Sequence, residues 1–491
     1  MTALLVKHGV RAAVPLGSEG RVRVQDHDRR QETGEANEPM CDARLDRLPA
    51  TRWRWKVFLM SGLAVLFAWS NYISGLVLAQ LSELGWVDTD SSAVFTSAYM
   101  AGMFLGSLVG GMIGDAIGRR KSYLLFVGLH TLTMYLAAVS PNISILTLVR
   151  AVMGFGLGAL LVTLFAGFSE YVPASTRGTW MGRNSFLGNC SNPISSLLAT
   201  MITPLVTADM NWRLMFVIPA VLSTAVWIWA WSRYPESPRW LESKGKYKDA
   251  ETVMRRIESE VEREYGRQLP PVKEHKGTHQ HAQHADVPYS ELFHGVLFRR
   301  VILGAFVLIA MNVTAYTLMT WLPTILLLKG IDINQSFVLY TVMAAGAPTG
   351  AFLAMELMDR CSRKAMGIGL LLIMAIVGPV FAFQESYLTI CVLGFLLQVI
   401  VEMYVVFSSG VYVPEIWPTE VRMRGSGLAN SVGRISGILT PFAVSYLLSC
   451  AGAPPVFAMM SIVAIVAAGI IAFLGIDTRG MTAEEIEDST V

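Results

Sequence analysis

The sequence predicts an all-α integral membrane protein with twelve transmembrane helices in two six-helix halves. Three observations support this prediction. Of the 491 residues, 53% are hydrophobic and only 15% are charged, long charge-free runs recur along the chain, and polar motifs of the first half return in the second. A soluble chain carries about 25% charged residues, because its surface must be solvated. The excess of apolar side chains must therefore face lipid.

Twelve apolar stretches are long enough to cross a bilayer, which requires about 20 residues each. Six of them lie within residues 55–232 and six within residues 301–476, where Glu402 interrupts the tenth stretch near its middle. We therefore expect two membrane-embedded halves of similar size, separated by one polar connection.

The polar segments are a leader (1–54), a central loop (233–300) and a tail (477–491). The leader has mixed charge and no apolar signal-peptide core, so we expect it to be disordered and cytoplasmic. Apolar residues at helical spacing over 247–265 predict short surface helices in the central loop. Lys and Arg gather in the short loops on one side of the bundle. The positive-inside rule places that side and both termini in the cytoplasm of an inner-membrane protein.

Several function classes lack their sequence features. A net charge of +2 with no basic face gives no surface for nucleic acid. The five cysteines are scattered without metal-ligand spacing. We interpret the histidines at 275, 279, 281 and 284 as part of a solvated spacer in the central loop and not as a metal site. No Ser-His-Asp arrangement or Gly-x-x-x-x-Gly-Lys-Ser/Thr phosphate loop is found. We expect no enzyme and no cofactor or metal, and a gradient rather than ATP as the energy source.

Polar motifs repeat between the halves. Each half has an acidic residue followed by basic ones after its second helix, and a Glu with an Arg seven places on after its fourth. The first copy consists of Asp115, Arg119, Arg120, Glu170 and Arg177, and the second of Asp359, Arg363, Glu415 and Arg422. Two similar halves around a midplane site are an architecture of secondary transporters.

The stretch Gly111–Arg120 reads Gly-Met-Ile-Gly-Asp-Ala-Ile-Gly-Arg-Arg, and it resembles the loop signature of the major facilitator superfamily. Pro235–Leu241 and the tail are similar to elements of sugar porters and of their organic-ion and metabolite-symporter relatives. The resemblance covers residues 55–490 and implies a transporter that alternates access to a central site. It also implies gating roles for Gly111, Asp115, Gly118 and the basic residues that follow, with Asp115 contacting helix 11. Glu170 with Arg177, and Glu415 with Arg422, would lock the outward-facing state. We expect a monomer.

Three charged residues lie inside predicted spans, where ionisable groups are costly and mark functional positions. By resemblance, Arg150 in helix 4 is linked to proton coupling, although it could instead reach the outer surface. Glu402 lies near the middle of helix 10, and Arg434 is about nine residues into helix 11, roughly 13 Å deep. Two interpretations remain open for the latter two. Either Glu402 permanently neutralises Arg434, or Arg434 binds a substrate carboxylate while Glu402 carries a proton.

The chain resembles the aromatic-acid:proton symporters, but its first predicted helix differs from theirs. Those proteins carry acidic residues in an Asp-Gly motif, whereas Phe67–Gly75 contains no carboxylate. Side chains that could contact a planar substrate beside Arg434 are Asn71, Tyr72, Asn312, Tyr316 and Gln398.

The expected function is proton-coupled uptake of a small organic acid, such as an aromatic or pyridine carboxylate. The partners are then a small molecule, protons and the lipid bilayer. The alternative is a sugar or polyol porter, which would need several amides in helices 5 and 7. A substrate-sensing membrane receptor is a third reading.

Overall fold

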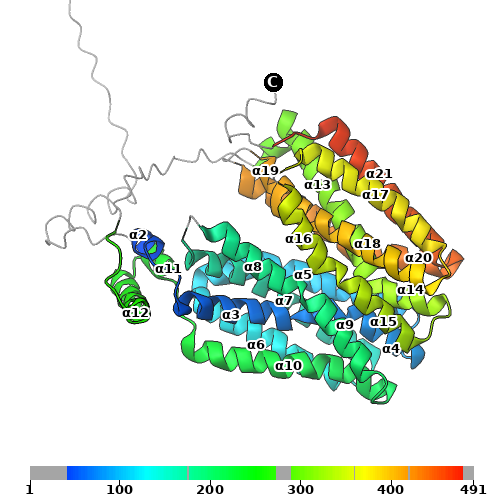
Figure 1. The fold of residues 1–491 in the computed structure, drawn as a ribbon, viewed down its shortest axis with the longest axis horizontal. Helices are drawn as coiled ribbons and strands as arrows, with labels where there is room; N and C mark the ends of the chain where they lie inside the picture. Colours follow the sequence, from blue (N-terminus) through cyan, green and yellow to red (C-terminus); the bar gives the residue numbers. More distant parts are fainter. Residues whose placement is uncertain (1–40, 174–175, 273–288, 359, 418–420, 479–491) are drawn as a thin grey trace, which may run out of the picture.

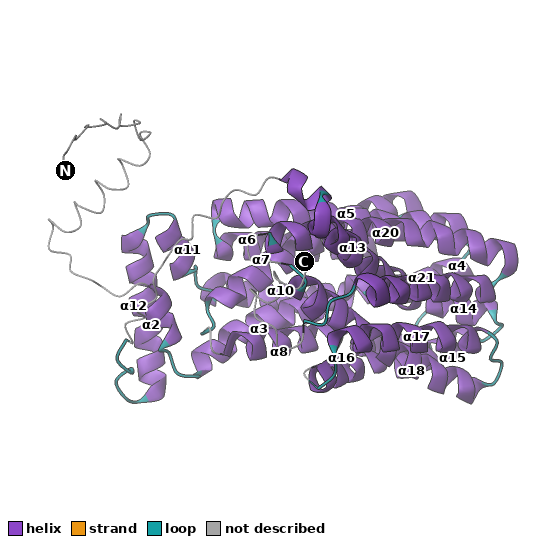
Figure 2. Ribbon diagram, turned by 90° about the horizontal axis from the view of Figure 1, so that it is seen from above, coloured by secondary structure: helices purple, strands orange, loops and turns teal. Residues whose placement is uncertain are grey.

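A computed structural model describes residues 41–173, 176–272, 289–358, 360–417 and 421–478. All regular elements in these ranges are helices (Figure 2). The fold follows from the apolar runs, because a backbone in lipid must satisfy its polar groups internally and a helix does so within one segment.

The first half contains six spans. They are α3 (Arg52–Phe67) with η1 (Trp69–Asn71) and α4 (Ile73–Glu83), then α5 (Thr89–Ile117), α6 (Arg119–Ala138), α7 (Ile143–Glu170), α8 (Arg177–Asn189) with α9 (Ser191–Ile202), and α10 (Ala208–Arg233).

The second half contains six more. They are α13 (Gly295–Tyr316) with η4 (Thr317–Trp321) and α14 (Leu322–Leu328), α15 (Ile333–Ala344) with α16 (Gly346–Met358), α17 (Arg363–Ala382), α18 (Tyr387–Val405) with η5 (Val406–Tyr412) and α19 (Val413–Glu415), α20 (Arg422–Ala451), and α21 (Ala453–Leu474).

Among the described residues, nine helical stretches are long and apolar enough to cross a membrane, and three of them join consecutive elements, such as α15 with α16. The other three predicted spans are α3–α4, α6 and α8–α9. The first and third of these are broken into shorter helices, and α6 opens with three basic residues, Arg119-Arg120-Lys121. The predicted fold class is confirmed.

The two halves lie side by side, and the helices of the central loop gather at one end of the first half (Figure 1). These are α11 (Pro238–Ser243) and α12 (Tyr247–Tyr265), followed along the chain by η3 (Tyr289–Phe293). We call this end of the bundle the central-loop end and the opposite one the far end.

Part of the leader is helical, which differs from the disordered leader expected over residues 1–54. Helix α2 (Cys41–Asp46) packs on α11 and α12, and Arg44 pairs with Glu251 and with Glu258, the latter at 2.6 Å. At the start of α3, Lys56 pairs with Glu260 at 2.7 Å. The basic leader and the acidic face of α12 are about 200 residues apart in sequence, so local composition does not reveal their complementarity. Residues 1–40 lie outside the described chain.

The halves meet through hydrogen bonds that lie toward the far end. Ser97 in α5 donates to the carbonyl of Ile438 in α20 at 2.8 Å, and Ser445, about two turns further along α20, donates to Asp90 at 3.1 Å. Thr200 in α9 and Thr341 in α15 share a hydrogen bond of 2.9 Å. These contacts join the halves where α4, α9, α14 and α15 also pack together.

Candidate functional site

Glu402 lies deep in the bundle on α18, with 2% of its surface exposed. The Asn189 side chain of the opposite half lies near its carboxylate. Gly350 of α16 packs directly on Glu402, since a Cβ at that glycine would lie 3.0 Å from the Glu402 Cβ. The absence of a side chain at this position leaves room for a carboxylate between α16 and α18.

Tyrosine and asparagine side chains from both halves lie in this region of the bundle. The Tyr72 hydroxyl donates to Asn189 Oδ1 at 3.5 Å, and the Tyr340 hydroxyl donates to Asn192 Oδ1 at 3.2 Å. Tyr72 also lies near Glu402, Tyr316 and Tyr340. The result is a polar, ring-lined region at the seam between the halves, as expected for a small-molecule site.

Some of the predicted binding residues lie at this interface between the halves. Tyr316 and Asn312 of α13 pack on two glycines of α20, with Gly437 3.2 Å from the Tyr316 ring and Gly433 3.0 Å from the Asn312 amide when a Cβ is placed on each. The Asn312 amide donates to the Leu308 carbonyl at 2.7 Å, so it already has a partner.

Other members of the set differ in what they offer. Gln398 is 1% exposed, and its Nε2 has no partner among the described residues. The side chain of Asn71 lies outside the described part of the structure. Tyr340, Asn189 and Asn192 are not in the predicted set, although the two asparagines lie on the fifth span, where a sugar porter would need amides. Both asparagines lie at the junction of α8 and α9, close to Pro193, which removes one helical hydrogen bond there.

Arg434 is partly exposed on α20 and lies close to Tyr316. It shares a helical face with Ile438, the residue that contacts α5. Among the described residues no ion pair joins Arg434 to Glu402, whose neighbour is Asn189 instead. In this conformation the permanent ion pair is therefore not formed, and the guanidinium is open to a ligand.

Arg150 is fully buried in α7 and points into the bundle rather than toward the surface. Its guanidinium donates to the Ser70 carbonyl at 2.8 Å and to the Ser74 hydroxyl. It also stacks over the rings of Phe95 and Tyr99, at 4.7 and 4.3 Å from their centroids. No carboxylate neutralises it in the described chain.

A polar chain continues from this arginine. The Ser70 hydroxyl bonds to His130 Nε2 at 2.9 Å and to the Tyr99 hydroxyl at 3.1 Å. Tight packing fixes the cluster, because a Cβ at Gly154 of α7 would lie 2.1 Å from the Tyr99 carbonyl. The first half therefore holds an uncompensated positive charge in a rigid setting.

The gating motif of the first half is built around Arg119. This side chain pairs with Asp115 at 2.6 Å and with Glu170 at 2.8 Å, both in its own half. The backbone amides of Arg119 and Arg120 donate to Glu236 at 2.7 and 3.0 Å. Among the described residues, the expected pairing of Glu170 with Arg177 is not formed, and Glu170 pairs with Arg119 instead.

The glycines of this motif differ in importance. Gly118 joins α5 to α6 with φ of +100°, which glycine adopts readily, and a Cβ there would lie 2.6 Å from the Glu236 carboxylate. At Gly111 a Cβ would meet nothing nearer than Val162 at 3.6 Å. A side chain therefore has no room at Gly118, whereas one at Gly111 would make only ordinary contact.

The second copy of the motif has the same plan. Arg363 pairs with Glu415 at 3.3 Å, and Glu415 also accepts from Thr478 at 2.6 Å. Asp359 and the side chain of Arg422 lie outside the described residues, so their predicted gating contacts remain predictions.

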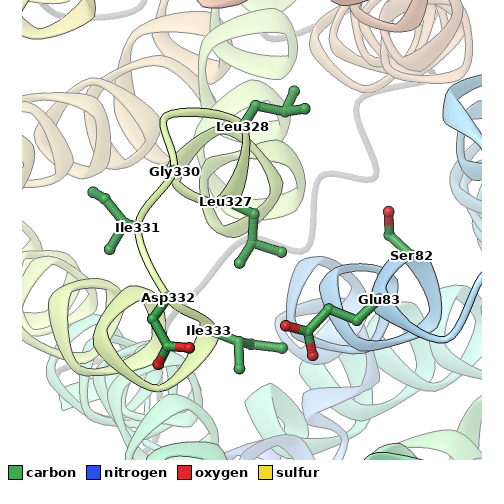
Figure 3. A pocket seen from close by; sticks show the side chains of 8 residues that line it. All are labelled: Ser82, Glu83, Leu327, Leu328, Gly330, Ile331, Asp332 and Ile333. Atoms are coloured by element: carbon green, nitrogen blue, oxygen red, sulfur yellow. The ribbon is translucent and has the colours of Figure 1, made fainter.

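A hollow of about 420 Å³ lies between the halves at the far end, away from Glu402 (Figure 3). Its lining comes from the end of α4 and from the connection between α14 and α15. The residues are Ser82, Glu83, Leu327, Leu328, Gly330, Ile331, Asp332 and Ile333. Two carboxylates from opposite halves, Glu83 and Asp332, thus share one hollow, while Lys329 turns away to the carbonyls of Ala382 and Gln384.

Replacing Glu83 by Gln should weaken the pH dependence of far-end closure. Burial, and then the nearby Asp332, raise the pKa of Glu83. If the halves separate here, both effects vanish, so a proton binds the closed end more tightly and falling pH favours closure. Spin labels at Ser82→Cys and Leu328→Cys, in a background without the native cysteines, report the separation. Glu83→Gln should resemble the low-pH state at every pH. Glu385→Gln, at an exposed far-end carboxylate outside the hollow, is the control. Unchanged pH dependence in Glu83→Gln would contradict this prediction.

Comparison with known proteins identifies the class. Residues 45–489 match the family described as "Sugar (and other) transporter", and the chain belongs to that family, within the major facilitator superfamily. It is a multi-pass membrane transporter of small molecules and not an enzyme.

Individual relatives are consistent with this class. The chain is 52% identical to YdjK of Escherichia coli (strain K12), provisionally named a metabolite transport protein, over 92% of this chain and 98% of that one. It is 28% identical to the niacin transporter NiaP of Acinetobacter baylyi, over 90% and 99% of the two chains. The proton:xylose symporter XylE, solved with 6-bromo-6-deoxy-D-glucose, has the same fold, with a TM-score of 0.64, 17% identity and coverage of 90% and 99%.

Proposed function

We propose that this protein takes up a small organic acid, of the aromatic or pyridine carboxylate type, together with protons. One observation carries the proposal: Arg150 and Arg434 lie inside the membrane-spanning bundle, and the described chain gives neither of them a carboxylate partner. A buried charge without a counter-charge is costly. A transported anion supplies that counter-charge when it binds.

Arg434 is the more direct ligand of the two. It is partly exposed at the seam between the halves, beside the ring of Tyr316. A guanidinium presents a planar fork that matches a carboxylate, and tyrosine rings suit a flat aromatic acid. Arg150 is enclosed by Phe95 and Tyr99, so it acts through its positive field and not by contact.

Glu402 is the proposed proton carrier. Among the described residues, Glu402 is the carboxylate buried in the middle of a span, and it lies near Asn189 of the opposite half. The residues of helix 1 that contact Arg150 are Ser70 and Ser74. Neither is a carboxylate, so helix 1 does not provide a proton carrier beside Arg150. Two of the similar proteins support this by name: one is a niacin transporter, and niacin is a pyridine carboxylate, and the other is a proton symporter.

The positive-inside rule supports placing the central-loop end and both termini in the cytoplasm of the inner membrane. With that orientation, far-end contacts such as Ser97 with Ile438 close the outer side. We therefore assign this conformation to the inward-facing state of a monomeric transporter. Arg119, Glu170 and Glu415, bound here within their own halves, would be free to exchange partners when the inner side closes.

A sugar or polyol porter is the second candidate. It is favoured by the buried amides near Tyr340, namely Asn189, Asn192 and Gln398, and by the likeness to a xylose symporter. Hydroxyl-rich ligands need several such donors and acceptors.

Uptake into proteoliposomes separates the two candidates. With an inward proton gradient, we expect nicotinate or benzoate to accumulate above its external concentration, and accumulation to stop when a protonophore removes the gradient. Xylose and inositol should neither accumulate nor compete. Accumulation of a sugar without any of the acids would instead establish the second candidate. Empty liposomes are the control, because weak acids also cross bilayers in their neutral form.

A further inference from the structure

The side-chain hydroxyl of Tyr340 is bonded to both halves of the bundle. Tyr340 lies on α15, about two turns from the far-end start of that helix, and 1% of its surface is exposed. Its hydroxyl donates to Asn192 Oδ1 of α9, in the first half, at 3.2 Å, and to the Met319 carbonyl of η4, in its own half, also at 3.2 Å. A hydroxyl group has a single proton, so one acceptor in each half shares it.

The Met319 carbonyl needs a donor because of a nearby proline. In an α-helix this carbonyl would accept from the backbone N–H of residue 323, which is Pro323 and has none. The chain winds as a π-helix over η4. The first half also approaches this turn, since a Cβ at Gly75 of α4 would lie 2.4 Å from the Thr320 carbonyl oxygen. The second half therefore holds the Tyr340 hydroxyl close to a point where the two halves touch.

The two hydrogen bonds of Tyr340 differ in what happens to them when the halves separate. Met319 belongs to the same half as Tyr340, so that bond can persist. The bond to Asn192 joins the halves and must break. Asn192 is fully buried, and within the described chain its side chain is held through Oδ1 by Tyr340, because its Nδ2 has no partner there. A bond made in one arrangement of the halves and lost in the other favours the first arrangement.

We propose that the Tyr340 hydroxyl stabilises the closed far end by binding Asn192 across the halves, and that this bond breaks each time the far end opens. One neutral hydrogen bond favours the state that contains it by about two- to twelvefold. The inference concerns the movement of the halves, so it goes beyond the proposed function and is independent of the substrate that the protein carries.

The test measures how often the far end opens in the purified full-length protein. Ser97→Cys, in a background without the native cysteines, is the reporter, because position 97 is 5% exposed and contacts Ile438 of the other half. When opening is rare and closing is fast, the rate of labelling by a maleimide follows the open fraction. We expect Tyr340→Phe to raise the labelling rate by about two- to twelvefold, and Asn192→Ala to raise it by a similar factor. The double variant should label no faster than either single variant, because both changes remove the same bond.

Tyr404→Phe is the matched control. Tyr404 is another fully buried tyrosine of the second half, but its hydroxyl donates to the Val307 carbonyl of the same half, at 3.1 Å. This variant should keep the wild-type labelling rate.

Three results would overturn the proposal. They are an unchanged labelling rate in Tyr340→Phe or in Asn192→Ala, factors that multiply in the double variant, and an equal rise in Tyr404→Phe. Labelling is measured without any substrate, so a failure of the proposed function leaves this test intact, and the reverse also holds.

Discussion

Glu402→Gln is expected to abolish concentrative uptake while substrate still exchanges across the membrane. The amide has nearly the same shape as the carboxyl group and can still bond to Asn189, but it cannot bind and release a proton. Transport then loses its coupling to the proton gradient, and the internal substrate concentration should not exceed the external one. Radiolabelled nicotinate uptake and counterflow in proteoliposomes measure the two activities separately.

Glu356→Gln provides the control for that experiment. Glu356 is an exposed acid on α16 that pairs with Arg360 at 3.3 Å, away from the seam. It should retain accumulation. Accumulation that survives in Glu402→Gln would place the proton site elsewhere, and the polar chain of Arg150, Ser70 and His130 would become the next candidate.

Arg434→Ala is expected to weaken binding of the acid by about 10- to 150-fold, which corresponds to a hydrogen bond with a charged group of about 1.5–3 kcal/mol. Arg434→Lys should lose less, since lysine keeps the charge but not the planar fork. Isothermal titration of the purified variants with nicotinate measures both losses.

A double variant addresses the ion-pair interpretation of the same residue. If Arg434 pairs with Glu402 in another state of the cycle, Glu402→Gln with Arg434→Ala should recover folding lost in either single variant. Since no such pair exists in this conformation among the described residues, we expect no recovery in the inward-facing protein.

The fold was predictable because lipid imposes a simple rule. A span must be apolar and helical, so long apolar runs such as those of α7 and α21 can be recognised as spans from the sequence. The interruptions inside spans have a local signal that a search for apolar runs does not use. Cys190 and Ala345 each lie three residues before a proline, Pro193 and Pro348, which removes one backbone donor from the helix.

The candidate site was predictable in its parts but not in its pairings. Hydropathy and helical rise gave the depth of Glu402 and Arg434, since both interrupt apolar runs. The rotation of each helix was not available from one sequence, so the choice of Asn189 rather than Arg434 as the neighbour of Glu402 could not be foreseen. Arg119 likewise binds two carboxylates 4 and 51 residues away, and only the second contact required the tertiary structure.

The central claim is that an uncompensated arginine binds the carboxylate of the substrate, and binding isotherms for nicotinate and nicotinamide test it most directly. The two ligands share a ring and differ in charge. We predict that Arg434→Ala loses most of its affinity for nicotinate and leaves the weaker affinity for nicotinamide nearly unchanged. Equal losses for both ligands would contradict the claim, because the arginine would then support the shape of the site and not the charge of its ligand.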